Sequence, residues 1–117
     1  MPHVVLNGTI HIENIFDKMN KLFIRKGPKI LRTMDMYLER GKNAILIESL
    51  AIEPGSKISF FTLISGRQDG VVVRLYPNIE VEKTDGVKQI LAEIGKQLML
   101  TFPKLNIGET NLAEYLK

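Results

Sequence analysis

The sequence contains no cysteine, which excludes disulfide bonds, thiolate zinc sites, iron–sulfur clusters and a cysteine nucleophile. It has no tryptophan and only two histidines, His3 and His11, whose spacing matches no recognised metal motif. We therefore predict no bound metal and no other cofactor. Long hydrophobic runs are also absent, since no apolar segment approaches the roughly 18 residues of a membrane-spanning helix. We accordingly expect no membrane partner.

Length and composition are those of one ordinary globular domain. The 117 residues are 44% hydrophobic and 25% charged, which is enough apolar material for a single core. We therefore predict one domain over residues 1–117. A cytoplasmic location is expected, because the first residues lack a basic stretch followed by a long apolar segment. The net charge of +3 gives nucleic-acid binding only weak support.

Three segments carry helix signals. Apolar residues recur at helical spacing over residues 12–22, and the Gly-Pro pair at 27–28 ends this first helix. A longer series predicts a second helix that starts at the N-cap Thr84 and buries Val87, Ile90, Leu91, Ile94, Leu98 and Phe102. A short terminal helix is predicted with Asn111 as N-cap and Glu114 closing a capping box.

Strand signals occupy the first residues and the middle of the chain. Residues 4–10 predict a first strand. Four further strands, separated by short polar turns, are predicted at residues 30–39, 44–52, 57–65 and 71–77. The turn before the last of them contains Asp69-Gly70, a common hairpin signal.

The resulting element order is β-α-β-β-β-β-α. It predicts an α+β two-layer sandwich, in which a long C-terminal helix covers a curved antiparallel sheet of four to five strands. This order resembles the fold group of the TATA-binding-protein repeat and the smaller helix-grip, Bet v 1-like proteins. The resemblance rests on element order over nearly the whole chain, and it implies a fold but no function.

Three charged residues, Arg32, Glu48 and Arg74, interrupt apolar strands. Glu48 has the same parity as Leu46 and Leu50, so we expect its carboxylate on the core side, where burial would raise its pKa. The simplest hypothesis is a cross-strand ion pair between Glu48 and one of the two arginines. Two alternatives are a binding site for an anionic ligand and a small enzyme in which Glu48 is the general acid or base.

Positive charge is concentrated between residues 21 and 32, where the chain carries Lys21, Arg25, Lys26, Lys29 and Arg32. Such a cluster can neutralise several phosphates, which makes nucleic-acid binding an alternative function. The segment has a single aromatic residue, Phe23, and no known nucleic-acid-binding signature. Cations near a helix C-terminus also interact favourably with the helix dipole, and we favour this explanation for the cluster.

Two further sites for small ligands can be considered. One set of residues that are either flexible or large is expected between helix and sheet, where it would line a pocket or fill the core. Its members are Met34, Met36, Phe60, Phe61, Met99 and Phe102. A filled core is the more common outcome in so short a chain. Lys83 and Lys88 flank the start of the second helix and could hold an anion there, although Asp85 opposes it.

Association with another chain has the best support. Ile45, Ile47, Phe61 and Leu63 are assigned to the sheet face opposite the core, and few helices are available to cover that face. We therefore predict a non-catalytic domain that acts as a homo-oligomer, with a dimer favoured, or as an accessory subunit of an unidentified partner. A small apolar or anionic ligand is an additional expectation.

Overall fold

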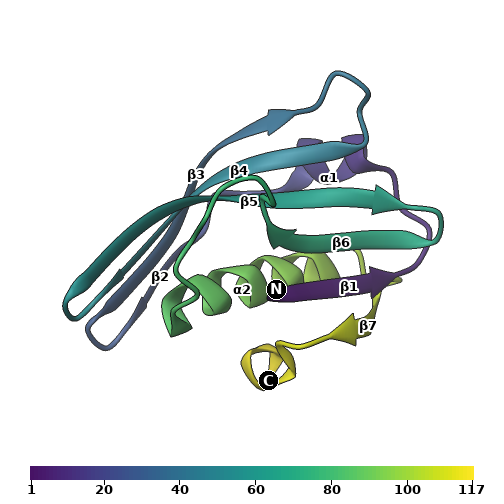
Figure 1. Cartoon of the computed structure of the whole chain (residues 1–117). Helices are drawn as coiled ribbons and strands as arrows, with labels where there is room; N and C mark the ends of the chain where they lie inside the picture. Colours follow the sequence, from purple (N-terminus) through teal and green to yellow (C-terminus); the bar gives the residue numbers. More distant parts are fainter.

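The computed structural model describes all 117 residues as a seven-stranded antiparallel sheet that curls into a half-barrel around a helix (Figure 1). The strands are β1 (His3–Asn7), β2 (Phe23–Lys26), β3 (Lys29–Leu38), β4 (Ala44–Glu53), β5 (Ser56–Arg67), β6 (Gly70–Leu75) and β7 (Asn106–Thr110). Their order across the sheet is β2-β3-β4-β5-β6-β1-β7.

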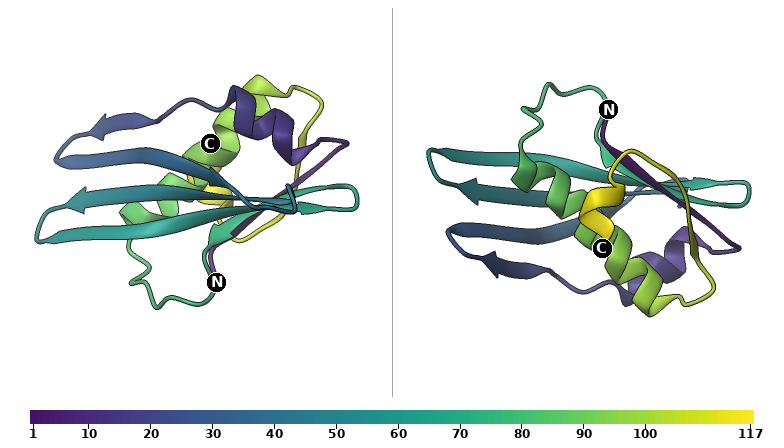
Figure 2. Two further views of the ribbon diagram at one scale, coloured as in Figure 1. Left: turned by 90° about the horizontal axis from the view of Figure 1, so that it is seen from above. Right: turned by 90° about the horizontal axis from the view of Figure 1, so that it is seen from below.

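Two α-helices, α1 (Ile12–Lys18) and α2 (Asp85–Thr101), and a 3-10 helix η1 (Ala113–Leu116) complete the chain. Figure 2 shows α2 running obliquely across the strands on one side of the sheet, with η1 packed against it. None of these helices combines the length and the apolar character required to cross a membrane.

The predicted two-layer sandwich is wrong, although the antiparallel sheet and the α+β content are confirmed. The sheet has seven strands, not four to five, and its curl produces a half-barrel. The long helix is not C-terminal either, because β7 and η1 follow it. Both additional strands lie in segments whose sequence gives other signals.

β2 lies where the sequence predicted the end of the first helix. The chain instead forms a hairpin in which Lys26 and Lys29 pair across a two-residue loop. Gly27 has a φ of 58° there, and a glycine with positive φ at the first loop position is typical of a type II′ turn. Leu22 already lies beyond the helix, since its N–H donates to Oγ1 of Thr33 at 2.8 Å and its carbonyl accepts the N–H of Thr33 at 3.0 Å. Apolar spacing alone did not distinguish this strand from a helix.

β7 extends the sheet beyond β1. Of its five residues only Ile107 is a large apolar one, so the strand pattern in the sequence is weak. The predicted N-cap Asn111 does not cap η1. Its Oδ1 accepts a hydrogen bond from the N–H of His3 at 2.9 Å, and its Nδ2 donates to the carbonyl of Met1 at 2.8 Å. Asn111 therefore ties the two ends of the chain together.

Alternate residues of the central strands face α2 and form the core. In β4, Ile45, Ile47 and Ala51 are fully buried, whereas Leu46 and Leu50 are half-buried on the opposite face. The predicted assignment of the two faces of β4 is therefore wrong. Because β4 is apolar at both parities, alternation cannot show which face a helix covers.

The prediction for α2 is confirmed. Oγ1 of the N-cap Thr84 accepts a hydrogen bond from the N–H of Val87 at 3.3 Å. The predicted stripe from Val87 to Leu98 is buried, and Phe102 packs beside the core at the helix end. A recess between α2 and β3 has no room for a water molecule, so this part of the core is filled.

Candidate functional site

The face of the sheet turned away from α2, hereafter the outer face, is covered by no helix. Strand pairing places Glu48 opposite Phe61, Leu46 opposite Leu63, and Leu63 opposite Arg74. Its side chains come from β3 to β6 and from the connection after β6. They are Arg32, Met34, Tyr37, Leu46, Glu48, Leu50, Phe61, Leu63, Arg74, Tyr76 and Ile79. Most of them are apolar or aromatic.

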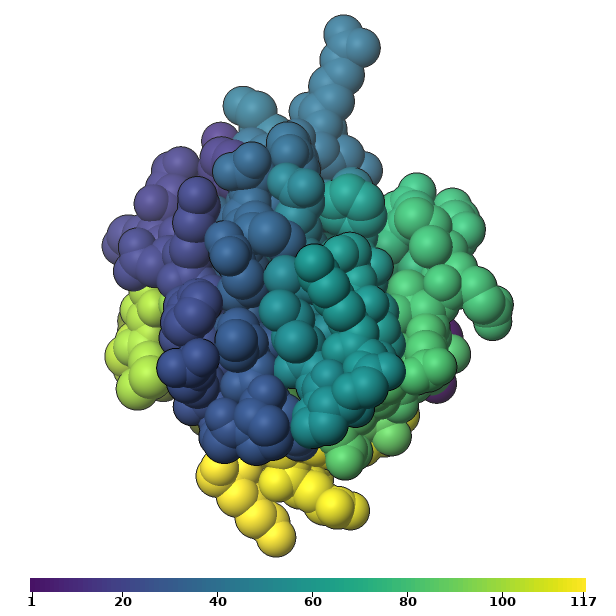
Figure 3. All heavy atoms as spheres, turned by 90° about the vertical axis from the view of Figure 1, so that its left-hand side faces the viewer, coloured from purple at the N-terminus to yellow at the C-terminus, as the bar shows by residue number.

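Two shallow hollows indent the outer face. The tyrosine hollow, of about 430 Å³, is lined by Tyr37, Leu38, Glu39, Ala44, Leu46, Leu63, Ser65 and Tyr76. The phenylalanine hollow, of about 450 Å³, is lined by Met34, Glu48, Ser49, Ser59, Phe60, Phe61 and Ile79. In Figure 3 the connection from β6 to α2 (green) stands out beside the β4–β5 hairpin (teal). The outer face is therefore indented, and this connection contributes Ile79 to it.

Only half of the residues predicted for an association surface lie on the outer face. Phe61 and Leu63 do, whereas Ile45 and Ile47 are fully buried in the core. The residues predicted to line an internal pocket are likewise divided. Met34 and Phe61 line the phenylalanine hollow. Phe60 borders this hollow but is buried in the core, and the remaining three pack against the core, namely Met36, Met99 and Phe102.

Glu48 lies on the outer face and not on the core side. Its carboxylate accepts a hydrogen bond from the phenol of Tyr37 at 2.9 Å. This hydrogen bond, together with weaker effects of desolvation and of the nearby carboxylates of Glu48 and Asp35, raises the pKa of Tyr37. Glu48 forms an ion pair with neither Arg32 nor Arg74, so the predicted cross-strand pair is absent.

Arg74 lies between Leu63 of β5 and His3 of β1 on the outer face. Its Nε is buried and has no hydrogen-bond acceptor, and its guanidinium forms no ion pair. A guanidinium has five donors that normally find oxygen partners. Arg74 is thus a cation without a carboxylate partner in a largely apolar surface.

Arg32 is exposed at the β2 end of the outer face, opposite Leu50 and Phe23. It shares this face with Glu48 and Arg74, but the three residues do not line a common hollow. The hypothesis of an enzyme with Glu48 as acid or base, and that of an anion held by all three side chains, gain no geometric support from this arrangement.

The basic segment between residues 21 and 32 is split between different surroundings. Lys26 lies 3.6 Å from Glu93 of α2, and Lys21 lies 3.8 Å from Asp35. Lys29 pairs with Lys26 at the hairpin turn, and Arg25 lies on the edge strand β2 opposite Ile30. Nucleic-acid binding by this segment stays a prediction, with two of its five cations already paired.

The start of α2 is occupied by a carboxylate of the protein itself. Oε1 of Glu53, at the end of β4, accepts the N–H of Gly86 at 3.0 Å. A Cβ at Gly86 would lie 2.7 Å from the Glu53 side chain, so only glycine admits this contact. The proposed anion between Lys83 and Lys88 would therefore have to compete with Glu53 for the helix N-terminus.

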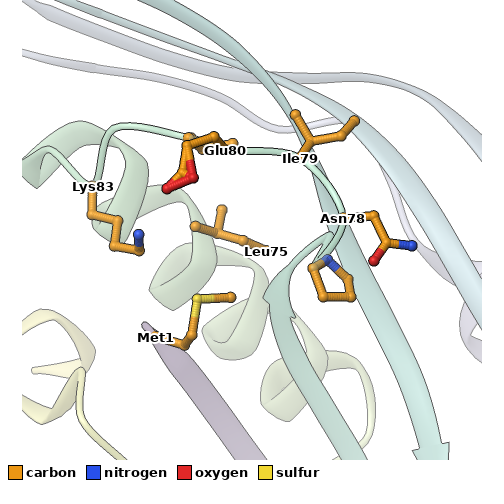
Figure 4. A pocket seen from close by; sticks show the side chains of 8 residues that line it. Met1, Leu75, Asn78, Ile79, Glu80 and Lys83 are labelled. Carbon is orange, nitrogen blue, oxygen red and sulfur yellow. The ribbon is translucent and has the colours of Figure 1, made fainter.

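The surface has two smaller recesses. Figure 4 shows the first, of about 210 Å³, where Lys83 and Glu80 of the β6–α2 connection lie above Leu75 and Met1. The second, of about 270 Å³, lies at the end of the sheet that contains the β3–β4 and β5–β6 turns. No three histidine, aspartate or glutamate side chains come close enough together to hold a metal ion.

Comparisons with protein-family models, with curated protein sequences and with solved structures found no match. The resemblance to the TATA-binding-protein repeat and the helix-grip group stays a prediction, and any function has to be argued from the surface of this chain.

Proposed function

We propose that this protein acts as a homodimer whose two copies pack through their outer faces. The observation that carries the proposal is the combination, on one face without a covering helix, of two apolar hollows and two charged groups that lack an ion-pair partner. A face of this kind is the usual surface of an association module.

Apolar burial supplies the driving force. Tyr37 and Ile79 are each 51% exposed, and they stand beside the hollows that another copy could fill. Aromatic residues in such positions dominate the energy of many interfaces. The molecule measures 40 × 30 × 24 Å, so even its smallest face is comparable with the about 800 Å² that a stable interface buries on each partner.

Charge supplies the specificity. A two-fold axis brings the same surface patch of both copies together, so each residue meets residues of the same patch in reverse order. The outer face carries Arg74 without an acceptor and Glu48 without a cation, a combination that is self-complementary. A second copy would supply the Glu48 carboxylate to Arg74, and the reverse contact would follow by symmetry.

Sedimentation velocity and light scattering over a range of micromolar concentrations test this proposal. We expect a dimer that dissociates on dilution, and the variant Leu46→Arg should be monomeric but still folded, as a cooperative thermal transition would show. Leu100→Arg is the matched control, because Leu100 is 82% exposed near the end of α2 and is not on the outer face. A wild-type chain that stays monomeric at high concentration would refute the dimer.

A chain that forms dimers equally well with Leu46→Arg and loses them with Leu100→Arg would place the interface elsewhere. If the wild type is monomeric but binds another protein through residues sensitive to Leu46→Arg, the role would be that of an accessory subunit. Either outcome contradicts the homodimer through the outer face.

A further inference from the structure

A polar recess, hereafter the hairpin cleft, lies at the end of the sheet away from the β2–β3 and β4–β5 turns. Figure 1 shows the β1–α1 connection, the β3–β4 turn and the β5–β6 turn at this end. The cleft has a volume of about 270 Å³, and all three connections contribute to it. Its residues are Thr9, Ile10, His11, Ile12, Glu13, Lys42, Asn43, Gly66, Arg67, Gln68 and Gly70.

Positive charge dominates the hairpin cleft. Lys42 and Arg67 line it from two different turns, and Glu13 is its single carboxylate. Lys42 Nζ lies 3.6 Å from Oε2 of Glu13, but both side chains are more than half exposed, so this pair is weak. Arg67 has no ion-pair partner. His11 adds a ring that can donate or accept a hydrogen bond.

The backbone at Lys42 is strained. Its φ of 60° is the one positive value at a residue other than glycine in the chain. This left-handed conformation suits glycine and is costly for a residue with a Cβ. Glycine is present next to it at position 41, yet the left-handed position holds a lysine. Such strain often accompanies a functional side chain, here the ammonium group of Lys42 in the cleft.

Part of the cleft wall is backbone rather than side chain. Gly66 lies beside Asn43, and a Cβ at Gly66 would overlap the Asn43 side chain. The N–H of Gly66 donates to the carbonyl of Asn43 at 2.9 Å, which joins the β3–β4 turn to the end of β5. The amide of Asn43 and the two cations therefore line one recess.

We propose that the hairpin cleft binds the phosphate group of a small ligand through Lys42 and Arg67. A guanidinium and an ammonium from two turns can contact different oxygens of one phosphate, and each charge-assisted hydrogen bond is stronger than a neutral one. The volume of about 270 Å³ is below the about 300–1,000 Å³ of pockets for drug-sized ligands, so the ligand is small. It is either free phosphate or a simple phosphate monoester.

Titration of the full chain with inorganic phosphate and with glycerol 3-phosphate, at constant ionic strength, tests the assignment. We expect saturable shifts of backbone amide resonances in residues 9–13, 42–43 and 66–70. Tighter binding of glycerol 3-phosphate would identify a monoester site, and equal or tighter binding of inorganic phosphate would identify free phosphate. Shifts spread over all surface lysines, or no saturation, would overturn the proposal.

Three variants sharpen the test. Arg67→Gln should weaken binding by about tenfold, which corresponds to the loss of one charge-assisted hydrogen bond. Lys42→Gly should also weaken it while raising the melting temperature, because glycine relieves the strained φ. The control Lys57→Gln removes a charge at the opposite end of β5 and should bind as the wild type. Binding that survives Arg67→Gln and Lys42→Gly, or that falls equally with Lys57→Gln, would refute the site.

Discussion

The two faces of β4 are built from similar residues but differ in burial. Ile45 and Ile47 face α2 and are fully buried, while Leu46 and Leu50, one position along, remain half-buried on the outer face. The sequence of the strand is nearly as apolar on one side as on the other. The difference arises from where a single helix lies, so the outer face is a second apolar surface that the fold itself leaves uncovered.

The largest expected effect separates these faces by one residue. Ile47→Ala should lower the free energy of unfolding by about 3 kcal/mol, because it removes buried methyl groups and leaves a cavity. Leu46→Ala should cost less than about 1.5 kcal/mol in the monomer, since Leu46 is still partly in water before the change. Urea denaturation at a concentration that favours monomer measures both. Equal losses would show that the outer face is a second core.

Much of the fold could be predicted where a sequence signal has one meaning. α2 combines an apolar series at helical spacing with Thr84 as a capping residue, and both were correctly assigned. The β5–β6 hairpin was also expected, and Arg67 pairs with Gly70 across its turn. β2 and β7 were missed because Leu22 fits a helical series as well as an extended segment, and Ile107 is the one large apolar residue of its strand.

The outer face invites a second test through its charges. Glu48→Arg and Arg74→Glu should each weaken the dimer by at least about tenfold, because like charges would then meet across the two-fold axis. An equimolar mixture of the two variants should form a heterodimer, since each arginine then meets a glutamate. Native mass spectrometry of the separate and mixed variants measures this. No heterodimer in the mixture would break the proposed pairing.

A matched control keeps this result interpretable. Glu39→Arg makes the same reversal of charge at the edge of the tyrosine hollow, which no arginine lines. This variant should change the salt dependence of association more than the dissociation constant of the dimer, as a charge at the rim of an interface does. The melting temperature of every variant is measured beside the wild type, because Arg74 has a buried Nε.

The candidate site was less predictable than the fold. Arg32, Glu48 and Arg74 lie in strands β3, β4 and β6, as expected, but Glu48 was assigned to the wrong face of β4. A bulge in β3 between Thr33 and Met36 also changes which residues of that strand share a face, and no local pattern in the sequence marks it. Which face of the sheet is buried depends on the position of α2, and this position is set by contacts between residues far apart in the sequence.

Two carboxylates of β4 extend the comparison to polar contacts. On the helix side, Glu53 accepts the N–H of Gly86 in the first turn of α2. Glu53→Ala should cost about 1–2 kcal/mol, because it leaves a helix N–H without a partner and removes a favourable charge from the dipole. On the outer face, Glu48→Ala should cost less than about 0.5 kcal/mol in the monomer, because water replaces it as the acceptor for Tyr37. Urea denaturation compares them, and a reversed order would contradict the assignment of roles.

The smallest expected effect concerns two tyrosines, each of which donates to a carboxylate. Tyr115 donates to Asp85 at 2.7 Å, and this hydrogen bond, with smaller contributions from desolvation and neighbouring carboxylates, raises its pKa from 10.0 to about 12. On the outer face, the hydrogen bond to Glu48 raises the pKa of Tyr37 in the same direction. Both phenols should therefore stay neutral at a pH where free tyrosine ionises.

The protonated phenol of Tyr115 is the hydrogen-bond donor, so the stability that this hydrogen bond contributes is lost when the phenol ionises at high pH. The folded-state pKa of Tyr115 lies above the unfolded value, so its contribution to stability is fully present below pH 10.0 and is lost as the pH rises to about 12. Tyr115→Phe should lower the free energy of unfolding by about 1 kcal/mol or less at neutral pH, given its contact with solvent. Phenolate absorbance, with Tyr115→Phe and Tyr37→Phe subtracted in turn, assigns each titration. If the phenol lost in Tyr115→Phe titrates near pH 10.0, its hydrogen bond does not hold η1 to the start of α2 in solution.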